Sequence, residues 1–290
     1  MTKALLLVIA VGTILGFCPP LAKIAAGRGV DALSFAFWQS LGAGIGLTLL
    51  CGARGVRAPV DARHLRYALI GGCLTLAAPH VLAYSAVTRI GSGLLGIVYT
   101  LPPIVTYAMM LALRRERFEA MRAAGIALGL IGAVLIVGLR GGLPDPAMWS
   151  WMLAALGVPV LLAMGNVYRT VDWPVGASGQ ALAAATLLGS SAILAAAALA
   201  GGHPIHRPGL DDWPIAAVVL LTGLGYLLYF ELQRVAGPVY LSFIGYLMIL
   251  VGVGFGHAVW DERLPPLTWL AIGVIAAGLL LVNRRKPSAA

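Results

Sequence analysis

The chain has 290 residues, of which 60% are hydrophobic and 11% are charged, and its mean hydropathy is +0.92. Soluble domains carry about 25% charged residues, so this chain lacks the polar residues that a water-facing surface needs. The net charge of +9 does not indicate a nucleic acid partner, because the basic residues lie between apolar runs. Cys18, Cys51 and Cys73 lack CxxC spacing, and we expect them to be small buried hydrophobes. The composition predicts a polytopic membrane protein.

Ten runs are long enough for a helix to cross the hydrocarbon core, which takes about 20 mainly apolar residues. In chain order they are 4–22, 32–51, 66–87, 92–112, 120–139, 149–168, 178–200, 213–234, 238–259 and 267–283. The connections are short, so no segment is long enough for a soluble domain. The first run also resembles a signal peptide, with Lys3 before it and small residues near Ala25. The internal repeat described below requires it as a span.

The distribution of Lys and Arg predicts the orientation, because cytoplasmic loops are enriched in these residues. The side that holds both termini carries 14 of them, namely Lys3, Arg54, Arg57, Arg63, Arg66, Arg114, Arg115, Arg117, Arg122, Arg169, Arg234, Arg284, Arg285 and Lys286. The opposite side carries six, namely Lys23, Arg28, Arg89, Arg140, Arg207 and Arg263. We therefore expect both termini in the cytoplasm of a bacterial cell, with the chain in the inner membrane.

The two halves of the chain repeat one pattern. Residues 84–89 and 229–234 both read Tyr followed by Arg five positions on, 145 residues apart, while Glu116–Arg117 and Glu262–Arg263, and Gly132 and Gly278, are each 146 apart. Five spans in each half make the second half enter the membrane in the opposite sense. We expect two inverted repeats, 1–141 and 148–286, in an all-α membrane protein of ten helices. Inverted repeats are typical of secondary transporters.

These features resemble the drug/metabolite transporter superfamily in its EamA-type branch, over nearly all of residues 1–285. Within that branch, the tract from Gly91 to Pro103 and the pair His80 and Tyr84 are similar to the aromatic amino acid exporters of the YddG type. The resemblance implies a ten-helix exporter of amino acids and similar small metabolites, with a central cavity between the halves. It supplies no invariant catalytic signature.

His80 is the first candidate for a substrate contact, because ionisable groups inside a membrane are costly and often functional. Tyr84 lies one turn further on the same helix face. His80 could hydrogen-bond a substrate carboxylate or carry a proton; the alternative is a structural histidine that bonds a neighbouring carbonyl.

Aromatic residues form two expected layers of the cavity. Trp38, Tyr84 and Tyr99 fall in the outer halves of their spans, and Tyr229 and Tyr246 fall in the inner halves of theirs. Their rings could hold an apolar side chain or an ammonium group. The alternative is packing or an interfacial belt. Asn166 and Ser242 add uncharged hydrogen-bonding groups, which could bind substrate or join two helices.

Two pairs of prolines predict breaks in helices. Pro19 and Pro20 lie late in the first span, and Pro102 and Pro103 lie near the middle of the fourth. A proline removes one hydrogen bond from a helix and clashes with the preceding turn. In lipid the freed carbonyls need protein, a cavity or substrate as partners. We therefore expect a hinge or a binding backbone at Pro102 and Pro103.

The sequence disfavours other classes of function. A serine hydrolase would need Ser92 beside His80, and no spacing indicates this. His203 and His206 have a spacing that metal ligands use, but they lie in a Pro-rich loop whose closest acids are Asp211 and Asp212. We expect a carrier and not an enzyme, with no metal and no cofactor. Its partners would be a small substrate and the lipid bilayer, with a monomer as one possible state; a channel and a multidrug exporter stay open as alternatives.

Overall fold

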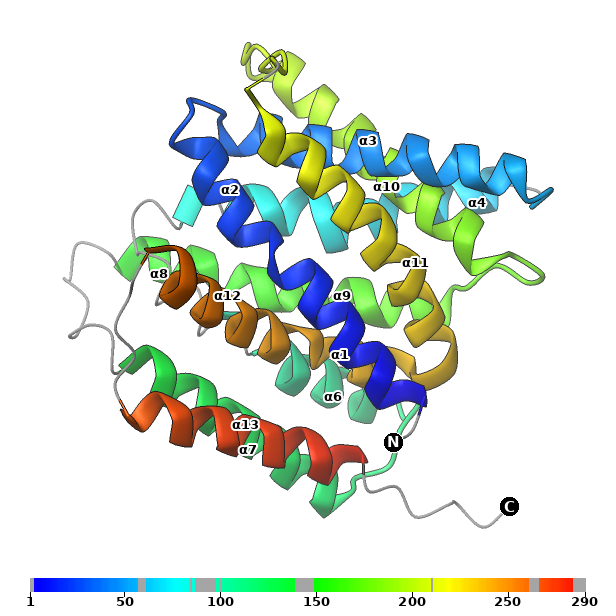
Figure 1. Ribbon diagram of the computed structural model, residues 1–290. Helices are drawn as coiled ribbons and strands as arrows, with labels where there is room; N and C mark the ends of the chain where they lie inside the picture. Colours follow the sequence, from blue (N-terminus) through cyan, green and yellow to red (C-terminus); the bar gives the residue numbers. More distant parts are fainter. Residues whose placement is uncertain are drawn as a thin grey trace.

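The described part of the chain is all helical. The computed structural model describes residues 3–56, 61–83, 85–86, 98–99, 101–138, 149–209, 211–260 and 266–283, and these residues include no strand (Figure 1). In chain order the elements are α1 (Lys3–Gly16), α2 (Cys18–Ala26), α3 (Ala32–Ala53), α4 (Ala62–Gly72), the π-helix η1 (Cys73–Ala77), α6 (Pro102–Ala112), α7 (Ala120–Gly138), α8 (Trp149–Ala155), α9 (Gly157–Val171), α10 (Gly179–Ala200), α11 (Trp213–Ser242), α12 (Ile244–Trp260) and α13 (Pro266–Asn283).

Described helix lies on all ten predicted runs, in part or in full. Six helical segments among the described residues are long and apolar enough to cross a membrane: Lys3–Ala26, Ala32–Ala53, Ala62–Ala83, Ser150–Val171, Gly179–Ala200 and Trp213–Ser242. The number of ten crossings and the cytoplasmic termini stay predictions.

Side-chain caps start several helices where the sequence leaves its apolar runs. Asp31 accepts a hydrogen bond from the Ser34 amide at the start of α3, and Asp61 accepts one from the His64 amide at the start of α4, each at 2.9 Å. Ser178 caps α10 in the same way. These side chains satisfy amides that have no partner within the first turn of a helix.

The first and fourth spans are broken at their prolines. Phe17 separates α1 from α2, and Pro19 and Pro20 occupy the first turn of α2. Pro102 and Pro103 begin α6 instead of interrupting a continuous helix. Before them, the Leu101 amide bonds the Val98 carbonyl at 3.2 Å, as in a turn. Proline fits the first turn of a helix, because the amide it lacks has no partner there.

Three further irregularities were not expected from the sequence. Leu156 separates α8 from α9. The third span contains the π-helix η1, a rare form that often occurs at functional sites. Within α11, Gly237 has φ 76° and ψ −177° and is followed by Pro238. The helix is therefore kinked at this point instead of being interrupted by a loop.

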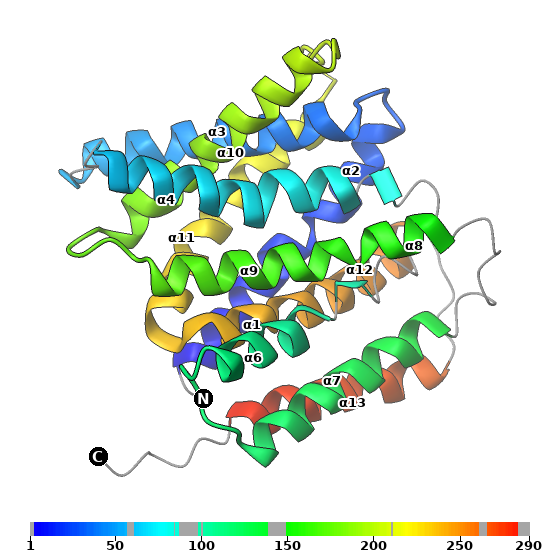
Figure 2. The same ribbon diagram turned by 180° about the vertical axis from the view of Figure 1, so that it is seen from behind.

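The helix contacts between the two halves are symmetric: a contact made by one helix of the first half is also made by the equivalent helix of the second half. The second helices α3 and α10 pack together, as do the fifth helices α7 and α13, which lie side by side in Figures 1 and 2. The first helix of each half packs on the fourth of the other, α1 on α12 and α9 on α6. The third helix of each half packs on the second of the other, α4 on α10 and α11 on α3. This pattern is that of two related halves around a two-fold axis.

Glycines allow the closest of these approaches. A Cβ on Gly278 of α13 would lie 2.7 Å from the Gly125 carbonyl oxygen of α7. A Cβ on Gly132 of α7 would lie 2.8 Å from the Ala271 carbonyl oxygen of α13. The two glycines that match in the sequence repeat therefore serve the same interface from opposite sides.

Candidate substrate site

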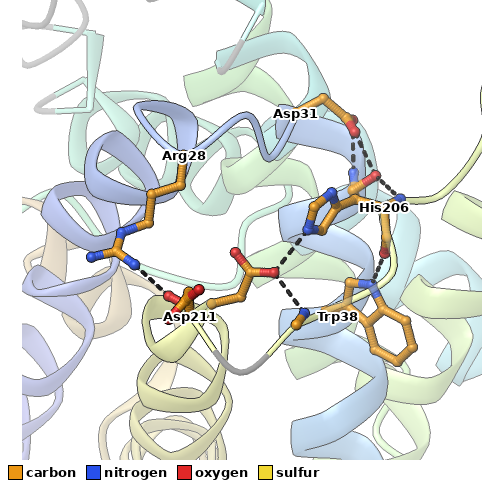
Figure 3. A network of polar contacts seen from close by, with 8 residues as sticks. Arg28, Asp31, Trp38, His206 and Asp211 are labelled. Carbon is orange, nitrogen blue, oxygen red and sulfur yellow. Dashed lines mark hydrogen bonds and ion pairs between the residues drawn. The ribbon is translucent and has the colours of Figure 1, made fainter.

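Polar contacts join the two halves at the end of the bundle that holds Trp38. Trp38 Nε1 donates to the His206 carbonyl at 2.7 Å, and the Ser34 hydroxyl accepts from the His206 amide at 2.9 Å. Arg28 donates to the Asp211 carbonyl (Figure 3). We call this set of Arg28, Ser34, Trp38, His206 and Asp211 the Trp38 end. Its first-half residues hold the loop that joins α10 to α11.

His206 uses its ring to order this loop. Its Nε2 lies 2.9 Å from Asp212 Oδ2, which also accepts from the Gly209 amide at 2.8 Å. The Gly209 amide and the His206 ring hold the pKa of Asp212 below its ordinary value of 3.8. Among the residues that the structure describes, no three His, Cys, Asp or Glu side chains are grouped so that they could hold a metal ion.

Ion pairs join the halves at the opposite end. Lys3 Nζ lies 2.6 Å from Glu231 Oε1, and Arg66 Nη2 lies 3.1 Å from Asp172 Oδ2. Arg234 adds a second cation to Glu231 at 2.8 Å. We call Lys3, Arg66, Asp172 and Glu231 the Lys3 end. Tyr168 and Arg66 hold the pKa of Asp172 below 3.8.

A buried polar cluster lies one helical turn inside the Lys3 end. Arg169 of α9 donates through Nη2 to Asn166 Oδ1 at 3.2 Å and to the Tyr229 hydroxyl at 2.6 Å. The Tyr229 hydroxyl in turn donates to Asn166 Oδ1 at 2.7 Å. The sequence predicted Asn166 and Tyr229 as substrate contacts, and the structure brings them together. It missed Arg169, which the orientation argument counted among the loop residues.

Aromatic rings enclose this arginine. Its guanidinium carbon lies 4.7 Å from the ring centre of Tyr229 and 5.2 Å from that of Phe230. Tyr67 of the first half donates its hydroxyl to the Arg169 carbonyl at 3.2 Å. Arg169, Tyr67 and Phe230 each have no exposed surface. We call Tyr67, Asn166, Arg169, Tyr229 and Phe230 the Arg169 cluster.

A glycine leaves room for the stem of the arginine. A Cβ on Gly71 of α4 would lie 3.2 Å from both Cγ and Cδ of Arg169. Such a distance is tight for two carbon atoms, whose optimum is about 3.5–4.0 Å. The spacing of Asn166 and Arg169, three residues apart on one helix face, is the signal that could have suggested the pair in advance.

Two other predicted site residues join helices. The Ser242 hydroxyl donates to Thr106 Oγ1 at 2.9 Å, which links the end of α11 to α6. The Tyr246 hydroxyl donates to the Ile126 carbonyl at 3.2 Å, which links α12 to α7. Neither contact reaches the Arg169 cluster. A role of Ser242 or Tyr246 in substrate binding stays a prediction.

The remaining predicted residues lie elsewhere. His80 is part of helical residues 78–83, directly after η1, and is half-buried. Tyr99 is half-buried beside a small cluster that includes Ala83 and Val158, and a Cβ on Gly245 would lie 2.4 Å from its carbonyl oxygen. Tyr84, the expected partner of His80, falls outside the described residues.

A second buried polar group was not predicted. Gln39 of α3 donates through Nε2 to Thr222 Oγ1 of α11 at 2.9 Å, and Cys18 Sγ lies 3.9 Å from the same oxygen. The amide oxygen of Gln39, Oε1, is buried and has no hydrogen-bond partner in the part of the chain that the structure describes. Like the Arg169 cluster, this group lies where helices of the two halves meet.

Known proteins match this chain over most of its length. The EamA-like transporter family matches it twice, at residues 2–138 and 148–284. The uncharacterized inner membrane transporter YedA of Escherichia coli (strain K12) is 26% identical over 252 residues, which are 85% of this chain and 79% of YedA; YedA of Escherichia coli O157:H7 gives the same values. A solved crystal structure agrees with a TM-score of 0.80 at 18% identity, over 96% of both chains, and so shares the fold. The chain therefore belongs to the EamA-like transporter family, and it is a multi-pass transporter of the inner membrane and not an enzyme.

Proposed function

We propose that this transporter exports amino acids, aromatic ones included, and similar small metabolites by alternating access. The halves 1–141 and 148–286 would move against each other, so that a site between them opens to one side of the membrane at a time. The observation that carries this proposal is that polar contacts join the halves at both ends of the bundle. The Trp38 end and the Lys3 end each consist of contacts between one half and the other.

Contacts of this kind suit a carrier because each is weak. An exposed ion pair contributes about 0–1 kcal/mol, and a single hydrogen bond about 0.5–1.5 kcal/mol. Either end can therefore open at a modest cost while the other stays closed. The closely packed pairs α3 with α10 and α7 with α13 would stay in contact and serve as the pivots about which the two halves move.

The buried groups between the halves support a small, partly polar and partly aromatic substrate. Asn166 and Gln39 offer amides, and Tyr229 offers a ring and a hydroxyl. An organic cation is a poorer candidate, because it would enter a site that already holds the charge of Arg169. Multidrug export is therefore the alternative outcome of the test.

The test is counterflow in proteoliposomes. The purified chain would be reconstituted with an internal load of unlabelled phenylalanine, and the entry of labelled phenylalanine would be measured. Liposomes without protein and liposomes loaded with an organic cation are the controls. We expect saturable entry with the amino acid load alone. Entry driven by the cation load would move the function to multidrug export, and unsaturable entry would indicate a channel.

A pH series in the same assay addresses the coupling. A carrier that exchanges a proton through His80 would change its rate with pH, and His80→Gln would abolish that change. A transport rate that is independent of pH in both proteins would exclude proton exchange through His80 and favour facilitated efflux.

A further inference from the structure

Arg169 is a charged residue in the buried interior of the bundle. It has no exposed surface, and no ion pair found among the described residues includes it. Asp172, three residues after Arg169, pairs with Arg66, and Glu231, two residues after Tyr229, pairs with Lys3 and Arg234. A buried arginine keeps its charge, and an unpaired buried charge is costly. The surrounding rings and amide compensate only part of that cost.

The guanidinium also has donors to spare. Nη2 serves both hydrogen bonds of the side chain, to Asn166 and to Tyr229. Among the described residues, Nε and Nη1 are buried and find no hydrogen-bond partner. Their N–H groups are unused, although a buried donor without a partner costs about 1–3 kcal/mol. Burial, charge and free donors together indicate that an anionic acceptor completes this site at another stage.

Arg169 is also positioned to become accessible when one end opens. It lies three residues before Asp172, and Tyr229 lies two residues before Glu231, on α9 and α11 respectively. Separation of the ion pairs at the Lys3 end would therefore move the two helices that hold the cluster. The Tyr67 hydroxyl, from the first half, donates a hydrogen bond to the backbone carbonyl of Arg169, so motion between the halves would also change this contact.

We propose that Arg169 is the substrate's carboxylate anchor, reached from the Lys3 end. In this structure the cluster is closed, and Asn166 and Tyr229 occupy only Nη2 of the guanidinium, which leaves Nε and Nη1 for the substrate. The carboxylate accepts from the free donors of Arg169, and the rings of Tyr229 and Phe230 contact an apolar or aromatic side chain. This inference rests on the proposed function and narrows its substrate class to carboxylates.

The experiment compares three competitors in the counterflow assay: phenylalanine, phenylalaninamide, which lacks the carboxylate, and 3-phenylpropionate, which lacks the ammonium group. For the wild type we expect phenylalanine and 3-phenylpropionate to compete at least about tenfold better than the amide, as the loss of a hydrogen bond to a charged group implies. Arg169→Gln should remove this preference, and Arg169→Lys should retain part of it.

Arg122 provides the matched control. It is a buried arginine of α7 with 3% exposure, its ring neighbour is Tyr107 at 5.8 Å, and Glu116 neutralises it. Arg122→Gln should lower stability without changing the preference for carboxylates. If Arg169→Gln and Arg122→Gln lower stability alike and leave the preference unchanged, Arg169 has a structural role and the proposal is wrong.

Two outcomes separate this proposal from the proposed function. Equal competition by the amide and the two acids would refute the carboxylate anchor, while the proposed carrier function would still stand. This comparison uses the wild type alone, so it does not depend on the folding of any variant. If the wild type does not exchange phenylalanine, the substrate proposal fails. The anchor is then judged by thermal stabilisation of the purified wild type by 3-phenylpropionate. Stabilisation that is lost in Arg169→Gln and partly retained in Arg169→Lys supports it, and its absence in the wild type, or an equal effect of chloride, refutes it.

Discussion

Replacement of Gly278 by alanine tests the two-fold packing of the halves. Gly278 lies where α13 crosses α7, and a Cβ there would meet the Gly125 carbonyl oxygen at 2.7 Å and the Gly129 amide nitrogen at 2.9 Å. Both atoms belong to the backbone of a helix, so neither can rotate away. We expect the variant to force α7 and α13 apart.

The magnitude follows from the geometry. Ordinary contacts of a Cβ begin at 3.4 Å, so the helices must separate by about 0.7 Å to raise the 2.7 Å contact to that distance. Overpacking of this kind costs about 1–3 kcal/mol, and we take the upper value because the neighbours are backbone atoms. Alanine returns about 1 kcal/mol through its higher helix propensity. The net loss is about 2 kcal/mol.

Gly273 is the matched control, because it is on the same helix and a Cβ there would have no atom of a neighbouring described helix within 4 Å. Gly273→Ala should be neutral or slightly stabilising. Thermal unfolding of both variants in detergent measures the difference, which we expect to be on the order of 5 °C. If Gly278→Ala melts at or above the temperature of Gly273→Ala, the close approach of α7 and α13 is wrong.

Three further changes address the two ends of the bundle. Glu231→Gln removes the ion pair with Lys3, which as an exposed pair contributes at most about 1 kcal/mol to keeping the Lys3 end closed. The end should therefore open up to about fivefold more often, and a cysteine introduced at Thr170 should react with a maleimide faster by the same factor. An unchanged rate would contradict a closing role of the ion pair. Asp172→Asn should lower the melting temperature at pH 7. Since the folded pKa of Asp172 is depressed, its contribution is present above 3.8 and is lost as the pH falls below that value, so the two proteins should converge there and a constant difference would argue otherwise. Trp38→Phe removes the 2.7 Å bond to the loop between α10 and α11, and cleavage of that loop before Asp211 by an aspartate-specific endoproteinase should accelerate severalfold, with equal cleavage as the opposing result.

The features that depend on hydrophobic length were predictable from the sequence. Runs of about 20 apolar residues need no knowledge of their neighbours to be recognised as helices. The repeat was also predictable, and Gly132 and Gly278 now have a physical reason for their common offset, since each lets the other half's helix approach. The family match at 2–138 and 148–284 agrees with a duplicated chain.

The local irregularities were less accessible. Pro102 and Pro103 mark a break, but only the packing of the preceding residues decides whether they kink a helix or begin one. Cys73 to Ala77 form a π-helix although no residue there is unusual for an α-helix. Such features arise from tertiary contacts, for example the close fit of Thr75 against Gly165 of α9.

Arg169 shows most clearly why the site could not be predicted in full. A loop assignment for Arg169, the first residue after the predicted run 149–168, is reasonable, because a charge is least costly near water. In the folded chain α9 continues to Val171 and α11 and α4 cover the arginine, which places its charge among Tyr67, Tyr229 and Phe230. A buried charge that lowers stability and has no evident structural role is typical of a functional site. The transporter tolerates the unpaired guanidinium, on our proposal, because the substrate's carboxylate supplies the missing charge in each cycle.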